Sequence, residues 1–278
     1  MVEINKSILK KVFKKRRDWS YKYDYGSLLI IGGSNLYHGS PALAGLVALR
    51  SGVDLVTIVA PERAADLIAS FSPDLITYPL EGDYIEKKHI PTVMRFCENK
   101  TAVIIGGGMC REKKILTAIR ELLKRIDLPT VVDADAIHAI ARNKKLIKKN
   151  FILTPHTHEF YVLTGKKPNE KLKERIELVK KASSLMKSTI LLKGFIDVIS
   201  DGKRTAINRT GNQFMTKGGT GDILAGICGS LLAQGVNCFD AACAAAFING
   251  KAGDLAAKNR KQGLLATDLI EKIPDVIR

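Results

Sequence analysis

Two kinds of segment alternate along most of the chain: short apolar runs and longer stretches with helical spacing. The strand-like runs are Ser27–Ile31, Val53–Ala60, Leu75–Leu80 and those that begin at Ala102, Pro129, Phe151 and Thr189. Five predicted helices have both ends given by the pattern: Pro61–Phe71, Ile90–Cys97, Arg111–Arg125, Ala241–Lys258 and Thr267–Arg278. Three more are expected: one with Pro41 in its first turn, one in the later part of Lys166–Lys187, and one that starts at Asp222. Near-continuous apolar runs are typical of strands buried on both faces. Because strand, helix and strand follow one another, we predict right-handed crossovers and an α/β fold with a mostly parallel sheet.

One pair of strands departs from this alternation. Phe195–Ser200 and Arg204–Asn208 are joined by Asp201-Gly202, which predicts an antiparallel hairpin. The hairpin leads directly into the most glycine-rich loop of the chain.

That loop ends in Gly218-Gly219-Thr220-Gly221-Asp222 and passes into an apolar helix. Glycines there allow backbone N–H groups to point at an anion, and the helix start adds partial positive charge. We therefore predict a phosphate-binding loop at Gly218, Gly219 and Gly221. Asp222 is either an ordinary first-turn carboxylate or a base that accepts a proton from a hydroxyl attacking a phosphoryl group. We favour the base, because three glycines, Thr220 and Asp222 converge.

Polar residues also follow other strands. Asp133 and Asp135 lie where parallel sheets bind ligands, although Asp135 is equally suited to cap the next helix. His156, His158 and Glu159 do not have the spacing of a helical zinc motif, so we expect no protein-bound metal here. We expect His156 to face a ligand.

Composition narrows the class of protein. The chain of 278 residues has no apolar run of membrane-spanning length and no apolar block after its basic start. Its five cysteines contain no C-x-x-C pair, so we expect core residues rather than disulfides or zinc ligands. We predict a soluble, cytoplasmic protein with one domain at residues 25–278 and a basic leader at residues 1–24.

The formal charge of +16 raises the question of nucleic acid. Lysines and arginines are spread over several predicted helices rather than concentrated with aromatic residues, so we expect solvated faces and no nucleic-acid partner. Within the leader, Ile4–Arg17 has a helical pattern, and a solvated helix is the commoner explanation of its charges. A basic field favours an anionic small substrate.

Taken together, several segments resemble one enzyme family. They are Gly26-Ser-Leu-Leu-Ile-Ile-Gly-Gly-Ser, Pro41-Ala-Leu-Ala, Arg50-Ser-Gly-Val-Asp-Leu-Val-Thr, Val132-Asp-Ala-Asp-Ala, Leu153-Thr-Pro-His-Thr-His-Glu-Phe, Leu192-Lys-Gly and Gly218-Gly-Thr-Gly-Asp-Ile-Leu-Ala-Gly. From about Tyr21 onward, in this order, they resemble the NAD(P)H-hydrate dehydratase family of the ribokinase-like superfamily. The 278 residues contain no counterpart of the family's separate epimerase domain.

The resemblance implies a ribokinase-like fold and repair of hydrated NADH and NADPH. ADP, or ATP in some members, with Mg²⁺ would drive loss of water from the S form of the hydrate. Asp222 would be the base, and Gly219, Thr220 and Gly221 would stabilise the phosphoryl group. The resemblance assigns nucleotide binding to Lys193, Gly194, Phe195, Ile196, Asp197, Asn212, Lys217, Gly218, Gly219, Thr220 and Gly221. It assigns hydrate binding to Ala44, Gly108, His156 and Asp222, and it implies a homotetramer.

Two segments depart from the family pattern. Gly106-Gly-Gly-Met-Cys replaces the usual Gly-Pro-Gly-Leu-Gly, and His156-Thr-His-Glu replaces His-Pro-Gly-Glu. Two other functions remain open. A small-molecule kinase of the same superfamily, acting on a vitamin-precursor alcohol or a sugar, would use the same loop. A non-catalytic nucleotide- or nucleic-acid-binding protein would explain the charge without Asp222.

Overall fold

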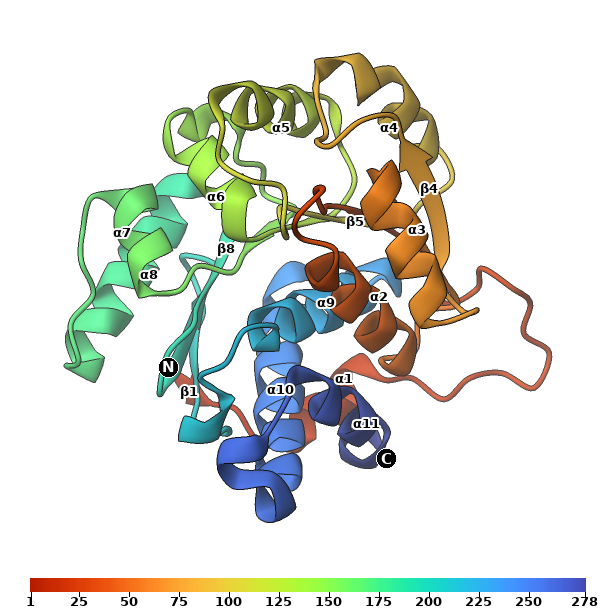
Figure 1. The fold of residues 1–278 in the computed structure, drawn as a ribbon. Helices are drawn as coiled ribbons and strands as arrows, with labels where there is room; N and C mark the ends of the chain where they lie inside the picture. The colour runs from red at the N-terminus through yellow and green to blue at the C-terminus, as the bar shows by residue number, and fades with distance from the viewer.

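A ten-stranded sheet crosses the whole molecule in the computed structural model, which describes all 278 residues (Figure 1). The strand order is β1-β10-β9-β8-β7-β6-β5-β2-β3-β4. Only β9 is antiparallel to its neighbours. The strands are β1 Val2–Glu3, β2 Ser27–Ile31, β3 Leu55–Pro61, β4 Ile76–Leu80, β5 Ala102–Ile105, β6 Thr130–Val132, β7 Phe151–Leu153, β8 Thr189–Leu192, β9 Asp197–Ser200 and β10 Thr205–Asn208.

Helices cover both faces of this sheet and form two separate cores. One core contains residues of α1, α2, α3, α9, α10 and α11, and the other contains residues of α4 to α8 (Figure 1). The helices are α1 Ser7–Val12, α2 Gly39–Arg50, α3 Glu62–Phe71, α4 Ile90–Cys97, α5 Lys113–Arg125, α6 Ala134–Ala141, α7 Thr157–Thr164, α8 Leu172–Met186, α9 Thr220–Ala233, α10 Cys238–Arg260 and α11 Ala266–Ile277. None of them combines the length and apolar character needed to cross a membrane.

The predicted α/β fold with a mostly parallel sheet is confirmed, and so is the hairpin, formed by β9 and β10. Several boundaries differ from the prediction by one to three residues, and two of these differences lie beside the glycine loop and the hairpin. The helix of the glycine loop begins at Thr220 rather than Asp222, and β9 begins at Asp197, which leaves Phe195 88% exposed in the preceding loop.

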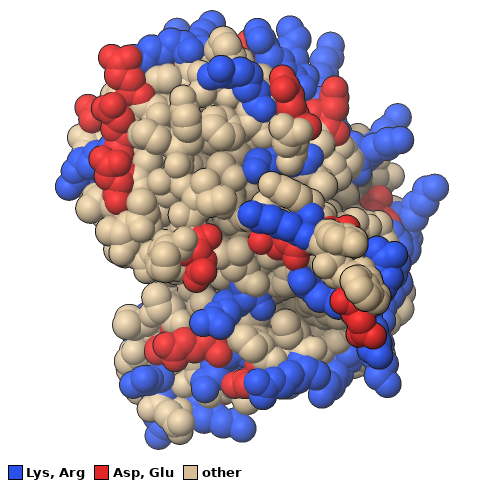
Figure 2. Space-filling model, turned by 90° about the vertical axis from the view of Figure 1, so that its right-hand side faces the viewer, with Lys and Arg blue, Asp and Glu red and all other residues tan.

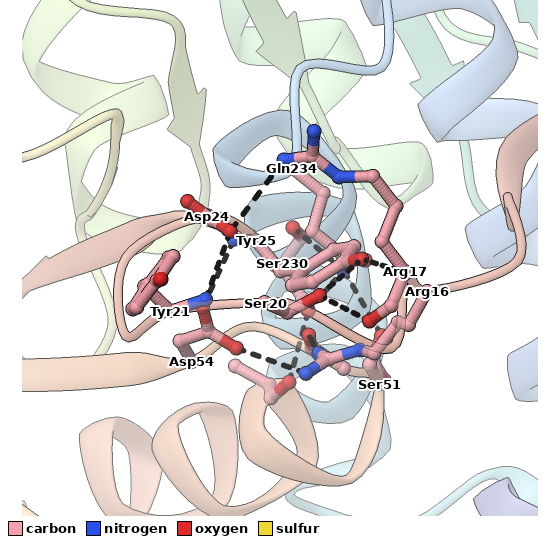
Figure 3. A network of polar contacts seen from close by, with 12 residues as sticks. Arg16, Arg17, Ser20, Tyr21, Asp24, Tyr25, Ser51, Asp54, Ser230 and Gln234 are labelled. Carbon is pink, nitrogen blue, oxygen red and sulfur yellow. Dashed lines mark hydrogen bonds and ion pairs between the residues drawn. The ribbon is translucent and has the colours of Figure 1, made fainter.

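The N-terminal helix predicted over Ile4–Arg17 is wrong in its length. Only Ser7–Val12 is helical, and the chain then becomes extended. Tertiary contacts explain this course: the Arg16 guanidinium donates hydrogen bonds to Asp54 (3.1 Å) and to the carbonyl of Gly52 (Figure 3). It also lies 3.9 Å from the centre of the Tyr25 ring. These contacts attach the segment to the loop that precedes β3.

The first residues are also attached to the main body of the fold. β1 pairs in parallel with β10, and Leu9 and Val12 are buried in the core beneath α10. The division of the chain at residue 24 remains a prediction.

Helix α9 is buried on nearly every side, as its residues from Ile223 to Ala233 show. A helix that is apolar all round belongs in a core. Its closest approach to α2 is at Gly226, where an added Cβ would lie 2.3 Å from Val47 Cγ1 and 2.5 Å from the carbonyl oxygen of Ala44. Only glycine fits here without moving one helix relative to the other.

We predict that Gly226→Ala lowers the free energy of unfolding by about 1–3 kcal/mol, the usual cost of overpacking a core. Chemical denaturation followed by circular dichroism measures it. Gly263→Ala is the matched control, because an added Cβ there meets nothing within 4 Å. Equal stability of the two variants would contradict the tight contact between α2 and α9.

Candidate active site

The carboxyl ends of the central parallel strands meet the start of α9. Asp133 follows β6, Thr154 follows β7 and Lys193 follows β8, while Gly106 follows β5. Such an edge is where open α/β sheets bind ligands. The site is therefore assembled from loops that the sheet places side by side.

Gly219 forms the N-cap of α9 with φ +94°, a left-handed conformation that favours glycine. An added Cβ there would also lie 2.7 Å from Leu43 and 2.8 Å from Ala266. The Thr220 hydroxyl donates to the Met215 carbonyl at 2.9 Å, which fixes the loop over the helix start. The predicted loop-to-helix junction thus has the geometry of an anion cradle.

Two cavities meet at this junction. The first cavity, about 730 Å³, is lined by Leu36, Tyr37, His38, Gly39, Ser40, Leu43, Gly108, Cys110, Arg111, Ala134, Asp135, Gly218, Gly219 and Asp222. The second cavity, about 610 Å³, is lined by His156, Thr157, Lys193, Gly194, Phe195, Asp197, Thr210, Gly211, Asn212, Gln213, Met215, Thr216, Thr220, Gly221, Leu224, Asn249 and Gly250. Asp222 faces the first cavity, and Thr220 and Gly221 face the second.

Most residues proposed from the sequence line one of these cavities. Gly108, Gly218, Gly219 and Asp222 line the first. The second brings together Lys193, Gly194, Phe195, Asp197, Asn212, Thr220 and Gly221. The division does not follow the two proposed roles strictly, because Gly218 and Gly219, which the sequence assigned to the nucleotide, line the first cavity together with Gly108 and Asp222.

Three proposed residues line neither large cavity. Ala44 is 4% exposed and lies where α2 packs against α9. Ile196 packs against the core beneath α8, and the Lys217 ammonium contacts the carbonyl of Gln262. Their roles in ligand binding remain predictions.

His156 lies in the second cavity, whereas the sequence associated it with the hydrate and hence with Gly108 and Asp222. Its ring Nδ1 accepts hydrogen bonds from the backbone N–H of His158 (3.1 Å) and Glu159 (3.4 Å) and so caps α7. Burial, followed by the nearby Lys193 ammonium, lowers the pKa of His156.

Asp222 is held by a neighbour that the sequence reasoning did not identify. The Ser40 hydroxyl, in the first turn of α2, donates a hydrogen bond to Asp222 Oδ1. Burial raises the pKa of Asp222 to about 6, and the Ser40 hydrogen bond partly opposes this shift. The only sequence signal for Ser40 was its position just before Pro41, at the start of a helix that follows a glycine turn.

Lys193 lies among carboxylates at the inner side of the second cavity. Its ammonium is 3.0 Å from Asp133 Oδ1 and 4.0 Å from Glu159 Oε2, and the Thr154 hydroxyl also donates to Asp133 at 2.7 Å. Burial opposes the charge of Lys193, but the two carboxylates outweigh it and raise its pKa. Burial raises the pKa of Glu159, and Lys193 works in the opposite direction.

Asp197 completes the second cavity at the start of β9. Its carboxylate accepts hydrogen bonds from the Gly194 N–H and the Asn208 amide, both at 3.0 Å. Burial raises the pKa of Asp197 to about 6, although both hydrogen bonds lower it. These bonds fix the loop that carries Phe195.

The chain has a mostly parallel sheet, a glycine loop that leads into a buried helix, and an acid in the first turn of that helix that lines one of two adjoining cavities. These features define a ribokinase-like protein, which confirms the fold class expected from the sequence. The chain belongs to the NAD(P)H-hydrate dehydratase family, whose model matches residues 28–275.

Named relatives agree with this membership. The bifunctional NAD(P)H-hydrate repair enzyme Nnr of Pyrobaculum aerophilum is 42% identical over 268 residues, which are 96% of this chain and 53% of that protein. The ADP-dependent (S)-NAD(P)H-hydrate dehydratase of Nitrosopumilus maritimus is 35% identical over 275 residues, 98% of this chain and 95% of that protein. The chain spans about half the length of the bifunctional relatives that it matches.

A solved structure is similar over the whole chain. The ADP/ATP-dependent NAD(P)H-hydrate dehydratase of Bacillus subtilis, co-crystallised with ATP and Mg²⁺, has a TM-score of 0.82 at 27% identity. The similarity covers 99% of this chain and 97% of that one.

We predict that Lys193→Met lowers the free energy of unfolding by about 3 kcal/mol at pH 8, because it leaves Asp133 and Glu159 buried without their cation. Burial already raises the pKa of Glu159, so ionising this carboxyl in the folded protein costs stability as the pH rises through its pKa. Without Lys193 the pKa of Glu159 rises further, and the cost of ionising it is larger than in the wild type. The deficit should therefore shrink at pH 5.

Urea denaturation at pH 5 and pH 8 measures this deficit. Lys171→Met is the matched control, because Lys171 pairs with Glu174 on the exposed surface and its loss should leave stability unchanged. A deficit for Lys193→Met that is independent of pH would show that the carboxylates do not cause it.

Proposed function

We propose that this protein is an ADP-dependent (S)-NAD(P)H-hydrate dehydratase that converts hydrated NADH and NADPH back to NADH and NADPH. The observation that carries the proposal is the position of Asp222 in the first cavity, directly after Thr220 and Gly221, which line the second. The hydrate would occupy the first cavity and the nucleotide the second. Family membership and the name of the Nitrosopumilus relative support the same reaction.

The chemistry requires a better leaving group than hydroxide. In the proposed first step Asp222 takes the proton of the hydroxyl on the hydrated ring, and the hydroxyl oxygen attacks the terminal phosphorus of ADP. The bond between that phosphorus and AMP breaks, which leaves a phosphate ester on the ring carbon. The ring nitrogen then pushes phosphate out, a proton leaves the adjacent carbon, and the dihydronicotinamide is restored.

The start of α9 is suited to the phosphoryl transfer. Phosphoryl transfer depends mainly on positioning and charge stabilisation. We assign the stabilisation of the transferring group to the backbone of Gly219, Thr220 and Gly221. Gly221 lies beside Lys193, since a Cβ added to Gly221 would be 3.4 Å from the Lys193 ammonium, an ordinary contact distance. The remaining nucleotide-binding residues assigned from the sequence belong to the same proposal.

Magnesium is also part of the proposal, and the Bacillus relative was crystallised with ATP and Mg²⁺. Carboxylate oxygens suit a hard cation, and Asp133 and Glu159 carry such oxygens next to Lys193, which lines the second cavity. Mg²⁺ bound to the nucleotide would neutralise phosphate charge there. No group of three or more His, Cys, Asp and Glu side chains has metal-binding geometry in the protein alone.

A small-molecule kinase would use the same junction but would release a phosphorylated product. Matches that extend over residues 28–275 to a dehydratase family favour dehydration. We further propose a cytoplasmic homotetramer that has no nucleic-acid partner. On the face drawn in Figure 2, lysines and arginines are scattered among carboxylates, which supports the last point.

We predict that hydrated NADH regains absorbance at 340 nm when the protein, Mg²⁺ and ADP are present, with one phosphate released per molecule repaired. Asp222→Ala should lower turnover by about 10³-fold, the usual contribution of a general base, while the affinity for ADP stays within twofold. Asp66→Ala, an exposed carboxylate on α3, is the matched control.

Each outcome separates the alternatives. A requirement for ATP instead of ADP would show that ATP, and not ADP, is the phosphoryl donor. ADP or ATP binding without any gain at 340 nm would favour a kinase, to be assayed with alcohol substrates. Full activity of Asp222→Ala would remove that residue from the role of base.

We predict that kcat/KM falls as pH decreases through about 6, because Asp222 must be deprotonated to accept a proton and its pKa is about 6. Ser40→Ala removes a hydrogen bond that lowers this pKa, so the acidic limb should move to higher pH. Initial rates at 340 nm between pH 5 and 8.5 measure the profile. If the acidic limb of the pH profile stays at the same pH in Ser40→Ala, the limb reports the ionisation of a group other than Asp222.

A further inference from the structure

The first cavity contains one permanently cationic side chain. Among its lining residues, Arg111 is the only lysine or arginine, and the other charged groups are Asp135 and Asp222. Hydrated NADH and hydrated NADPH each carry a diphosphate, and hydrated NADPH carries a further 2′-phosphate. A cavity with two carboxylates and one guanidinium can accept such a ligand favourably only if its phosphates lie near the guanidinium.

Arg111 is held in a fixed orientation toward this cavity. Its Nε donates to Asp135 Oδ1 at 2.7 Å, while the backbone N–H of Cys110 donates to the other oxygen, Oδ2, at 2.8 Å. The two terminal nitrogens of Arg111 make no hydrogen bond within the protein, and its side chain is 54% exposed. The guanidinium therefore has two donor groups free for a ligand.

The backbone on both sides of this ion pair is strained. Cys110 has φ +76° and Ala134 has φ +46°, values that residues other than glycine rarely adopt. Strain of this kind clusters at ligand sites. Here the strained residues flank Arg111 and Asp135, and both carboxylate oxygens of Asp135 accept hydrogen bonds, one from Arg111 and one from Cys110.

We propose that Arg111 binds phosphate oxygens of the hydrated dinucleotide in the first cavity and that Asp135 positions it. This inference rests on the proposed function and adds a substrate-recognition residue to it. Arginine suits the task because its planar donors match two phosphate oxygens at once. The contact also orients the substrate, since the phosphates lie at Arg111 and the hydroxylated ring lies at Asp222.

The test compares Arg111→Gln, Arg111→Lys and the control Lys113→Gln in steady-state assays with hydrated NADH and hydrated NADPH. Lys113 is exposed, lines neither cavity and lies two residues away, so its loss changes the net charge equally. Arg111→Gln should raise KM for the hydrate about tenfold and change kcat and the KM for ADP less than twofold. Arg111→Lys keeps the positive charge but loses the paired planar donors, so its KM for the hydrate should lie between those of the wild type and Arg111→Gln.

The two substrates distinguish which phosphate is bound. Equal rises in KM for both hydrates would assign Arg111 to the diphosphate, and a rise confined to hydrated NADPH would assign it to the 2′-phosphate. A KM within twofold of wild type for both hydrates, or an equal rise in Lys113→Gln, would overturn the proposal.

A second measurement separates this inference from the reaction itself. NADPH binding, followed by its fluorescence, needs no turnover. If wild type binds NADPH about tenfold more tightly than Arg111→Gln yet repairs no hydrate, the proposed function fails while the phosphate contact stands. If wild type repairs the hydrate and both proteins bind NADPH equally, the phosphate contact fails. Should Arg111→Gln unfold, Arg111→Lys provides the same comparison.

Discussion

The close packing of α9 against α2 is the constraint on which the site depends. α9 is surrounded by core, and Gly226 allows it to approach Ala44 and Val47. Because the helix cannot shift, its first turn is fixed relative to the loops at the ends of the strands. Asp222 is thereby held against Ser40 of α2, and the start of α9 separates the two cavities. A core contact made by glycine thus determines where a carboxylate presents its charge.

Burial then adjusts the chemistry of the fixed groups. Removing a carboxylate from water disfavours its charged form, which raises the pKa of Asp222 and of Glu159. Lys193 counteracts this effect, since its ammonium lies 3.0 Å from Asp133 and 4.0 Å from Glu159. The cluster keeps charges of both signs near the place where phosphate would be transferred. Packing fixes their arrangement, and preorganised charges are effective in stabilising a transition state.

Local sequence predicted the site only in part. Glycines before an apolar helix required a loop with unusual backbone angles, and the loop is found with Gly219 at φ +94°. His156 was associated with the hydrate side, but its ring caps α7 beside the second cavity. Ser40 gave almost no signal, because serine before proline at a helix start is common for structural reasons alone. The N-terminal helix was predicted too long because charged residues with helical spacing give no indication that Arg16 contacts Asp54.

The order of strands and helices, the hairpin and the left-handed backbone of the glycine loop follow from residues that are neighbours in the chain. Hydrophobic period and backbone preference act over a few residues, so a single sequence expresses them. The partition into two cavities, the pairing of Ser40 with Asp222 and the position of Arg111 beside Asp135 depend on segments that are far apart in the chain. Packing brings those segments together, and burial then raises the pKa of Asp222. Neither effect leaves a pattern in the local sequence.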